Sequence, residues 1–199
     1  MIRHHIKSVL IVAALSGALQ AVIYVNPYTG TISLSELVLQ LSGSRGEFAL
    51  GVSLHELLGF AMRMVPSYIA SAFIGTELYR HYCTASVYVF SRHPNRLSWY
   101  AKEVGFIFSS AVVFYIIQLA TTIVTTIFRY QIDFDWAGCG LLLYHLAIYT
   151  LWLFTMSMLI NLLSVFFGSD SAFLSVIIGQ SALTNYMTAF WQPHIPISI

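Results

Sequence analysis

Charge is the scarcest feature of this sequence. Only 9% of its 199 residues are Asp, Glu, Lys or Arg, whereas 58% are hydrophobic and 15% are aromatic. An average soluble domain is about 25% charged. Nine basic and eight acidic side chains are too few to cover a surface that faces water. We therefore expect an exterior that meets lipid, which excludes a soluble enzyme and a disordered chain.

Further absences exclude other classes of protein. The net charge of +1 lacks the dense basic face that nucleic acid requires, so no nucleic-acid partner is expected. Two cysteines, Cys83 and Cys139, support neither a metal cluster nor a disulfide framework. His55 and Glu56 begin like a zinc-protease helix, but the position of the second histidine holds Gly59. With neither a phosphate-binding loop nor a nucleophile elbow, the sequence predicts no catalytic, metal or cofactor site.

Long uncharged runs are what the sequence contains instead. A helix needs about 20 mostly apolar residues to cross about 30 Å of hydrocarbon. The runs predict an all-α integral membrane protein, a single transmembrane domain over 1–199 built as a helical bundle. Its five predicted transmembrane helices cover about 9–25, 57–75, 104–128, 139–167 and 172–190.

Basic residues predict which side of the membrane each connection faces. With the N-terminus in the cytoplasm, six Lys and Arg lie on the cytoplasmic side and two on the other, as the positive-inside rule favours. The six are Arg3, Lys7, Arg80, Arg92, Arg96 and Lys102. We therefore expect a multi-pass protein of the cell membrane, with 26–53 extracellular and 76–103 cytoplasmic.

The extracellular connection contains a short helical pattern. Ser33 and Glu36 have the spacing of a capping box, which satisfies free N–H groups at a helix start. The next apolar residues share one helical face; they are Leu34, Leu37, Val38 and Leu41. This pattern predicts a short amphipathic helix that lies on the bilayer surface.

The cytoplasmic segment 76–103 carries a second amphipathic pattern. Apolar or aromatic residues recur at helical spacing from Leu78 to Val89, and the helix must end before Pro94. One interpretation is an interfacial helix that only anchors the connection. The other is a contact surface for a partner protein.

Two stretches of sequence resemble the permease subunits of type-2 ABC exporters. In that family a Gly-Thr pair, a coupling helix, an Arg-containing turn and a Lys lead from the second transmembrane helix to the third. Here Gly75-Thr76, residues 77–90, Arg92 with Arg96, and Lys102 follow that order. The stretch Ile-Asn-Leu-Leu-Ser-Val-Phe-Phe-Gly-Ser at 160–169 is similar to the junction of the fourth and fifth helices. The family has six transmembrane helices, whereas this sequence predicts five.

The resemblance implies a permease subunit without its own ATP site. A separate cytoplasmic ABC ATPase, which holds ATP and Mg, would grip the coupling helix and drive alternating access. The cargo would be a peptide or hydrophobic compound of the bacteriocin or antimicrobial-peptide type. A second permease copy or a different permease would complete the path in a bacterial membrane. Residues expected at the ATPase interface are Tyr79, Tyr82, Tyr88, Phe90, Arg92 and Arg96. The alternative is a stand-alone membrane immunity protein that binds a bacteriocin.

Polar residues inside the predicted helices are further candidates. A charge at the centre of the bilayer costs about 2.5–3.5 kcal/mol, so Arg63 either contacts a substrate in the pathway or extends outward toward Glu56. Gln118, His145 and Gln180 are expected to form hydrogen bonds between helices, or to line the pathway. Gln20 belongs with them, and Pro66 predicts a kink one turn after Arg63.

Overall fold

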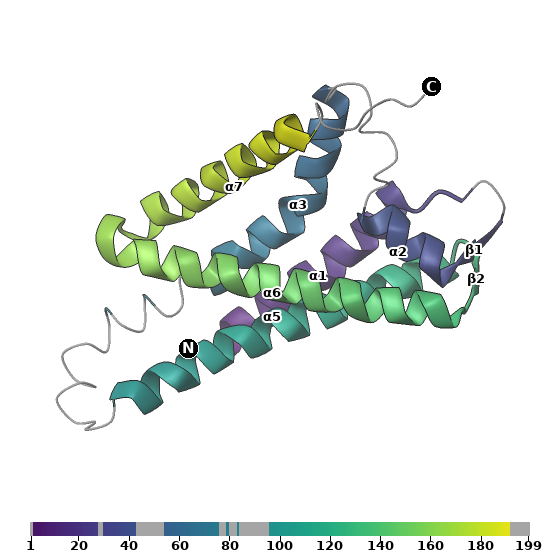
Figure 1. Ribbon diagram of the computed structural model, residues 1–199. Helices are drawn as coiled ribbons and strands as arrows, with labels where there is room; N and C mark the ends of the chain where they lie inside the picture. Colours follow the sequence, from purple (N-terminus) through teal and green to yellow (C-terminus); the bar gives the residue numbers. More distant parts are fainter. Residues whose placement is uncertain are drawn as a thin grey trace.

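A computed structural model describes residues 2–27, 30–42, 54–75, 79, 83 and 96–191. Side chains are described for these residues except 2–6, 54–62, 96 and 183–191. Helices make up most of the described chain, as the composition predicts (Figure 1). The long helices are α1 (Ile2–Tyr24), α3 (Leu54–Ile74), α5 (Arg96–Ile127), α6 (Trp136–Phe167) and α7 (Ser169–Trp191). The short elements are α2 (Leu34–Ser42) and the strands β1 (Thr31–Ser33) and β2 (Gln131–Asp133).

Each of the five predicted apolar runs is helical, and the helices extend beyond the runs. Helix α5 begins at Arg96, whereas the uncharged run begins at Val104. The run marks only the part of a helix that can lie in hydrocarbon, because charged residues such as Lys102 continue the same helix outside it. Among the described residues, three helices are long and apolar enough to cross a membrane, and they lie in α1, α5 and α6.

The bundle is organised around the contact between α1 and α5. These two helices lie against each other along much of their length, and α6 packs across α5 and α2 (Figure 1). A Cβ at Gly17 would clash with the carbonyl oxygen of Gln118 and with Thr121 Oγ1, so only glycine allows this approach. A core cluster that includes Val9, Ala70 and Phe114 joins α1, α3, α5 and α6.

Helix α7 doubles back along α6. The turn is Gly168, whose φ of 82° is a left-handed conformation that glycine adopts readily. Its N–H donates to the carbonyl of Ser164 at 3.0 Å, which closes the end of α6. The predicted helices 139–167 and 172–190 are therefore separate, and α7 begins three residues earlier than predicted, at Ser169.

The short helix α2 forms where the capping pattern predicts it. Ser33 Oγ accepts a hydrogen bond from the N–H of Glu36 at 3.1 Å. Its apolar face is buried, with Leu37 at 0% exposure, and packs with residues of α1, α5 and α6. The prediction that this face lies on the bilayer surface is therefore wrong. A parallel pair of strands, with Ile32 opposite Ile132, contributes to the same cluster and was not predicted.

Asp135 joins the starts of two helices. Its side chain accepts hydrogen bonds from the N–H of Ser35 in α2 at 3.1 Å and of Gly138 in α6 at 3.0 Å. Burial raises the pKa of Asp135, but these hydrogen bonds outweigh it and hold the pKa below the ordinary value of 3.8. A Cβ at Gly138 would lie 2.6 Å from the Ser35 nitrogen, so glycine is required for this approach.

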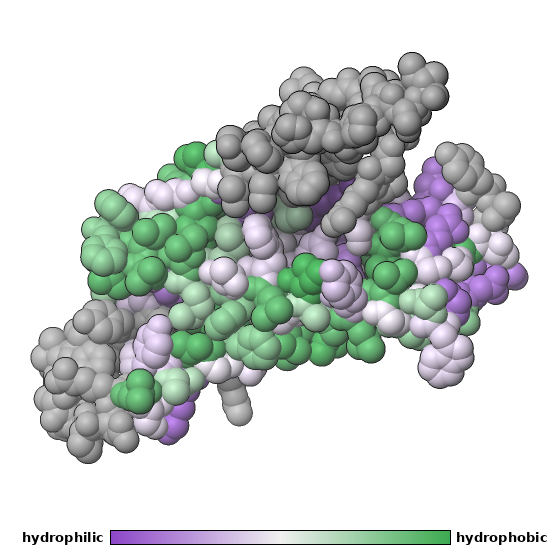
Figure 2. Space-filling model, in the orientation of Figure 1, coloured by the Kyte–Doolittle hydropathy of each residue, from purple (hydrophilic) through white to green (hydrophobic). Residues whose placement is uncertain are grey.

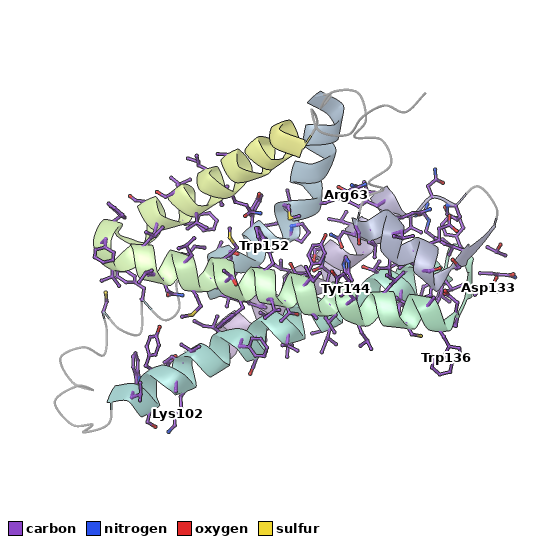
Figure 3. The ribbon with its side chains drawn as sticks, viewed as in Figure 1. Arg63, Lys102, Asp133, Trp136, Tyr144 and Trp152 are labelled. Atoms are coloured by element: carbon purple, nitrogen blue, oxygen red, sulfur yellow. The ribbon has the colours of Figure 1, made fainter. Side chains whose placement is uncertain are left out.

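The surface is apolar along the middle of the bundle. Hydrophobic residues cover the visible faces of α6 and α7, whereas hydrophilic residues gather at the two ends (Figure 2). Leu151, Leu162 and Val165 of α6 are each at least 55% exposed. Lys102 and Asp133 lie at opposite ends of the bundle (Figure 3). This distribution is the one expected of helices surrounded by lipid with their ends in water.

Candidate functional site

A small polar cavity lies inside this apolar bundle. It is enclosed by residues from α1, α2, α3, α5 and α6. They are Gln20, Leu41, Arg63, Ser67, Tyr115, Gln118, Leu119, His145 and Tyr149. Its free volume of about 10 Å³ is about what one water molecule needs. In this conformation the cavity admits a water but not a peptide or a drug-sized compound.

Four of the five predicted intramembrane polar residues meet at this cavity, and Gln20 of α1 is one of them. Arg63 comes from α3, Gln118 from α5 and His145 from α6. Arg63 lies on the side of α3 toward α2 (Figure 3). Gln180 is buried on α7 and does not line the cavity. The sequence therefore identified the residues, and the fold brings most of them to one place.

Hydrogen bonds between helices form part of the cavity wall. Gln118 Nε2 donates to Gln20 Oε1 at 2.7 Å, a hydrogen bond between α5 and α1. The hydroxyls of Ser67 and Tyr115 lie 2.7 Å apart. His145 Nδ1 lies 3.0 Å from the hydroxyl of Ser42 at the end of α2.

Two polar atoms of the cavity residues are buried and have no hydrogen-bond partner among the described residues. They are Nε of Arg63, a donor, and Oε1 of Gln118, an acceptor. The Arg63 guanidinium lies 5.0 Å from the centre of the Tyr24 ring, a cation–π contact that stabilises the charge in part. The side chain of Glu56, the expected partner of Arg63, lies outside the described residues. A group that both accepts and donates, such as a water or an amide, would satisfy both atoms.

The cavity also contains residues that the sequence analysis did not select. Each lies about one helical turn from a residue that it did select: Ser67 follows Arg63 by four, Tyr115 precedes Gln118 by three, and Tyr149 follows His145 by four. Residues three or four apart share one face of a helix. A search for polar or aromatic pairs at this spacing would have found all three.

The predicted ATPase-contact residues are only partly described. Tyr82, Tyr88, Phe90 and Arg92 lie outside the described residues, and Arg96 is the first residue of α5 without a described side chain. Tyr79 is described: its backbone N–H donates to Asn161 Oδ1 of α6 at 2.9 Å. A hydrogen bond with the Cys83 side chain raises the pKa of the Tyr79 hydroxyl.

Within the described part of the chain, no group of His, Cys, Asp or Glu is placed to hold a metal ion. Cys83 and Cys139 are both free thiols. No known protein family, curated protein or solved structure matches the chain. Among the described residues, the cavity and the Tyr79–Asn161 contact are therefore the two features that bear on function.

Proposed function

We propose that the chain is a membrane permease subunit that moves a peptide or hydrophobic compound by alternating access, driven by a separate cytoplasmic ABC ATPase. The observation that carries the proposal is the polar cavity among apolar helices, with an arginine in its wall. Charged residues inside a membrane are costly and are retained mainly where they serve a pathway or a ligand.

The chemistry of the cavity suits the amide groups of a peptide. Arg63 offers a donor and Gln118 an acceptor, both without partners in the described structure. A peptide amide carries an N–H and a C=O, so it can pair with both. Because the free volume is only about 10 Å³, the helices must separate before such a group enters. An opening of this kind is the step that ATP would drive.

The proposed ATPase partner is supported by the resemblance of residues 75–102 to the coupling region of type-2 ABC exporters. Tyr79, at the start of that region, contacts α6 through Asn161. Force applied to the segment therefore has a route into the bundle. In this proposal the segment is cytoplasmic and the chain works with a second permease.

Co-purification tests the proposal. The full chain, tagged at its own genomic locus, is purified in mild detergent and its partners are identified by mass spectrometry. We expect an ABC ATPase in the complex, and a loss of it when Tyr82→Ala or Arg92→Ala is introduced. Tyr144→Ala, an equivalent change at an exposed position of α6, is the control. If no ATPase accompanies the chain, or if both variants retain it fully, the proposal is wrong.

Protection assays separate the proposal from a stand-alone immunity protein. Cells that express the chain are challenged with a bacteriocin to which it confers resistance, with and without an active ATPase. A permease loses its effect when the catalytic glutamate of the ATPase is replaced. An immunity protein would protect equally in both strains.

A further inference from the structure

Asn161 lies at the junction of α6 with the segment that follows α3. Its side chain is 3% exposed, and both ends of its amide are used. Oδ1 accepts from the backbone N–H of Tyr79 at 2.9 Å, and Nδ2 donates to the carbonyl of Ser157 at 2.8 Å. A single side chain therefore connects Tyr79, 82 residues earlier in the sequence, to the backbone of α6.

The choice of asparagine is informative. Ser164, a turn later and also buried, satisfies its hydroxyl on the carbonyl of Ile160 within its own helix. A serine or threonine at 161 could do the same, so burial alone does not call for an amide. A hydroxyl can also accept while it donates, but its oxygen lies one bond closer to the backbone than Oδ1 of asparagine, so the amide is the group that bonds within α6 and also reaches Tyr79.

The neighbouring residue of α6 continues the connection toward α7. Ile160 is fully buried and packs with Met156 and with Val176 of α7. On its other side, the Cδ1 atom of Ile160 lies 3.1 Å from the position that a Cβ on Gly75 would occupy. The end of α3, the C-terminal third of α6 and the first half of α7 are therefore in contact around Ile160 and Asn161.

From this geometry we infer that Asn161 is a positioning residue that docks the backbone of Tyr79 onto α6, so that motion of Tyr79 reaches the α6–α7 pair. The inference rests on the proposed function. The contact at Asn161 gives the motion a route into α6, in addition to α3 and α5, which the segment joins along the chain.

Hydrogen–deuterium exchange at the Tyr79 amide tests the docking directly, on the full chain in lipid nanodiscs and without any partner. Asn161→Thr can satisfy its hydroxyl within α6 but is too short to hold Tyr79, and we expect the Tyr79 amide to exchange at least tenfold faster. Asn161→Asp keeps the acceptor for Tyr79 but loses the Nδ2 donor to Ser157, so the Tyr79 amide should exchange more slowly than in Asn161→Thr. Leu162→Ala, on the exposed side of the same turn, is the control. Unchanged exchange in Asn161→Thr would overturn the inference.

Transport measurements test the second half of the inference. In the complex with its ATPase, Asn161→Thr should retain the bound ATPase but lose at least tenfold in cargo moved per ATP hydrolysed. Full transport with an undocked Tyr79 would show that α6 does not receive the motion. If no ATPase binds any version of the chain, the proposed function fails, whereas the exchange result on the chain alone still decides the docking.

Discussion

Two arginines in this bundle have similar surroundings and different hydrogen bonding. Arg129 and Arg63 each lie about 5 Å from a tyrosine ring, at 5.2 Å from Tyr130 and 5.0 Å from Tyr24. Arg129 also donates to the carbonyl of Ala21 at 3.2 Å, near the end of α1, and to the Tyr130 hydroxyl at 3.3 Å. The buried Nε of Arg63 has no hydrogen-bond partner in the part of the chain that the structure describes.

The regions around the two arginines, the α1–α5 contact and the cavity, also differ in how completely their polar atoms are paired. Along the contact of α1 and α5, Thr122 donates to the carbonyl of Gly17 at 3.0 Å and Gln118 donates to Gln20. Around the cavity, buried atoms of Arg63 and Gln118 remain unpaired, at a cost of about 1–3 kcal/mol for each such group. The α1–α5 contact is thus built to hold one arrangement, whereas among the described residues the cavity contains buried polar atoms that its own walls do not pair.

The largest effect is expected where α1 and α5 approach most closely. Gly17→Leu would place a side chain against the backbone of Gln118, so the two helices must separate. We expect a loss of about 3 kcal/mol or more of the free energy of unfolding. Thermal unfolding in detergent measures it. Gly140→Leu, with nothing near its Cβ position, is the control and should be tolerated. Equal stability of the two variants would show that α1 and α5 are not tightly joined.

Asp135 tests whether the outer wall of the cavity depends on a helix cap. Asp135→Ala removes the acceptor for both α2 and α6, so we expect a lower melting temperature and a looser α2, which carries Leu41 and Ser42. Because the folded pKa is lowered, this stabilisation is complete above pH 3.8 and is lost as the pH falls through the folded value. Asp133→Ala, an exposed neighbour, is the control. An unchanged melting temperature for Asp135→Ala would contradict the double cap.

A smaller effect is expected from the glutamine pair. Gln20→Leu, Gln118→Leu and the double variant form a thermodynamic cycle that isolates their hydrogen bond. Hydrogen bonds between membrane helices couple by about 0.6 kcal/mol on average, with a maximum of about 1.7. Denaturation in mixed micelles measures the coupling. A coupling energy of zero would show that this hydrogen bond does not stabilise the contact between α1 and α5.

Periodicity and charge predicted the helices. They did not predict contacts between residues that are far apart in the sequence. The helical positions follow from apolar runs, and the cap of α2 from Ser33. The pairing of β1 with β2 was not predictable, because three-residue strands carry too little pattern and their partners are a hundred residues apart. The burial of α2 was missed because a face that fits lipid also fits protein. Arg63, Gln118 and His145 could be selected one at a time, but their meeting at one cavity depends on packing.

The smallest change in stability is expected at the site with the largest proposed role. Arg63→Met removes a buried donor that has no partner, so we expect the free energy of unfolding to change by less than about 1 kcal/mol. Arg129→Met removes a cation that caps α1, and should cost about 0.5–1 kcal/mol. Transport should show the reverse order, with a severe loss for Arg63→Met and little for Arg129→Met.

The pair also has an outcome that would contradict this comparison. Removing one member of a buried ion pair costs about 3–5 kcal/mol, because the other charge is left without a partner. If Arg63→Met loses that much, Arg63 is paired after all, and Glu56 is the acid to examine. Glu56→Gln should then cost a similar amount, and the double variant should recover part of the loss. Arg63 would in that case hold the bundle together as Arg129 does. The cavity would then offer a ligand no unpaired arginine donor.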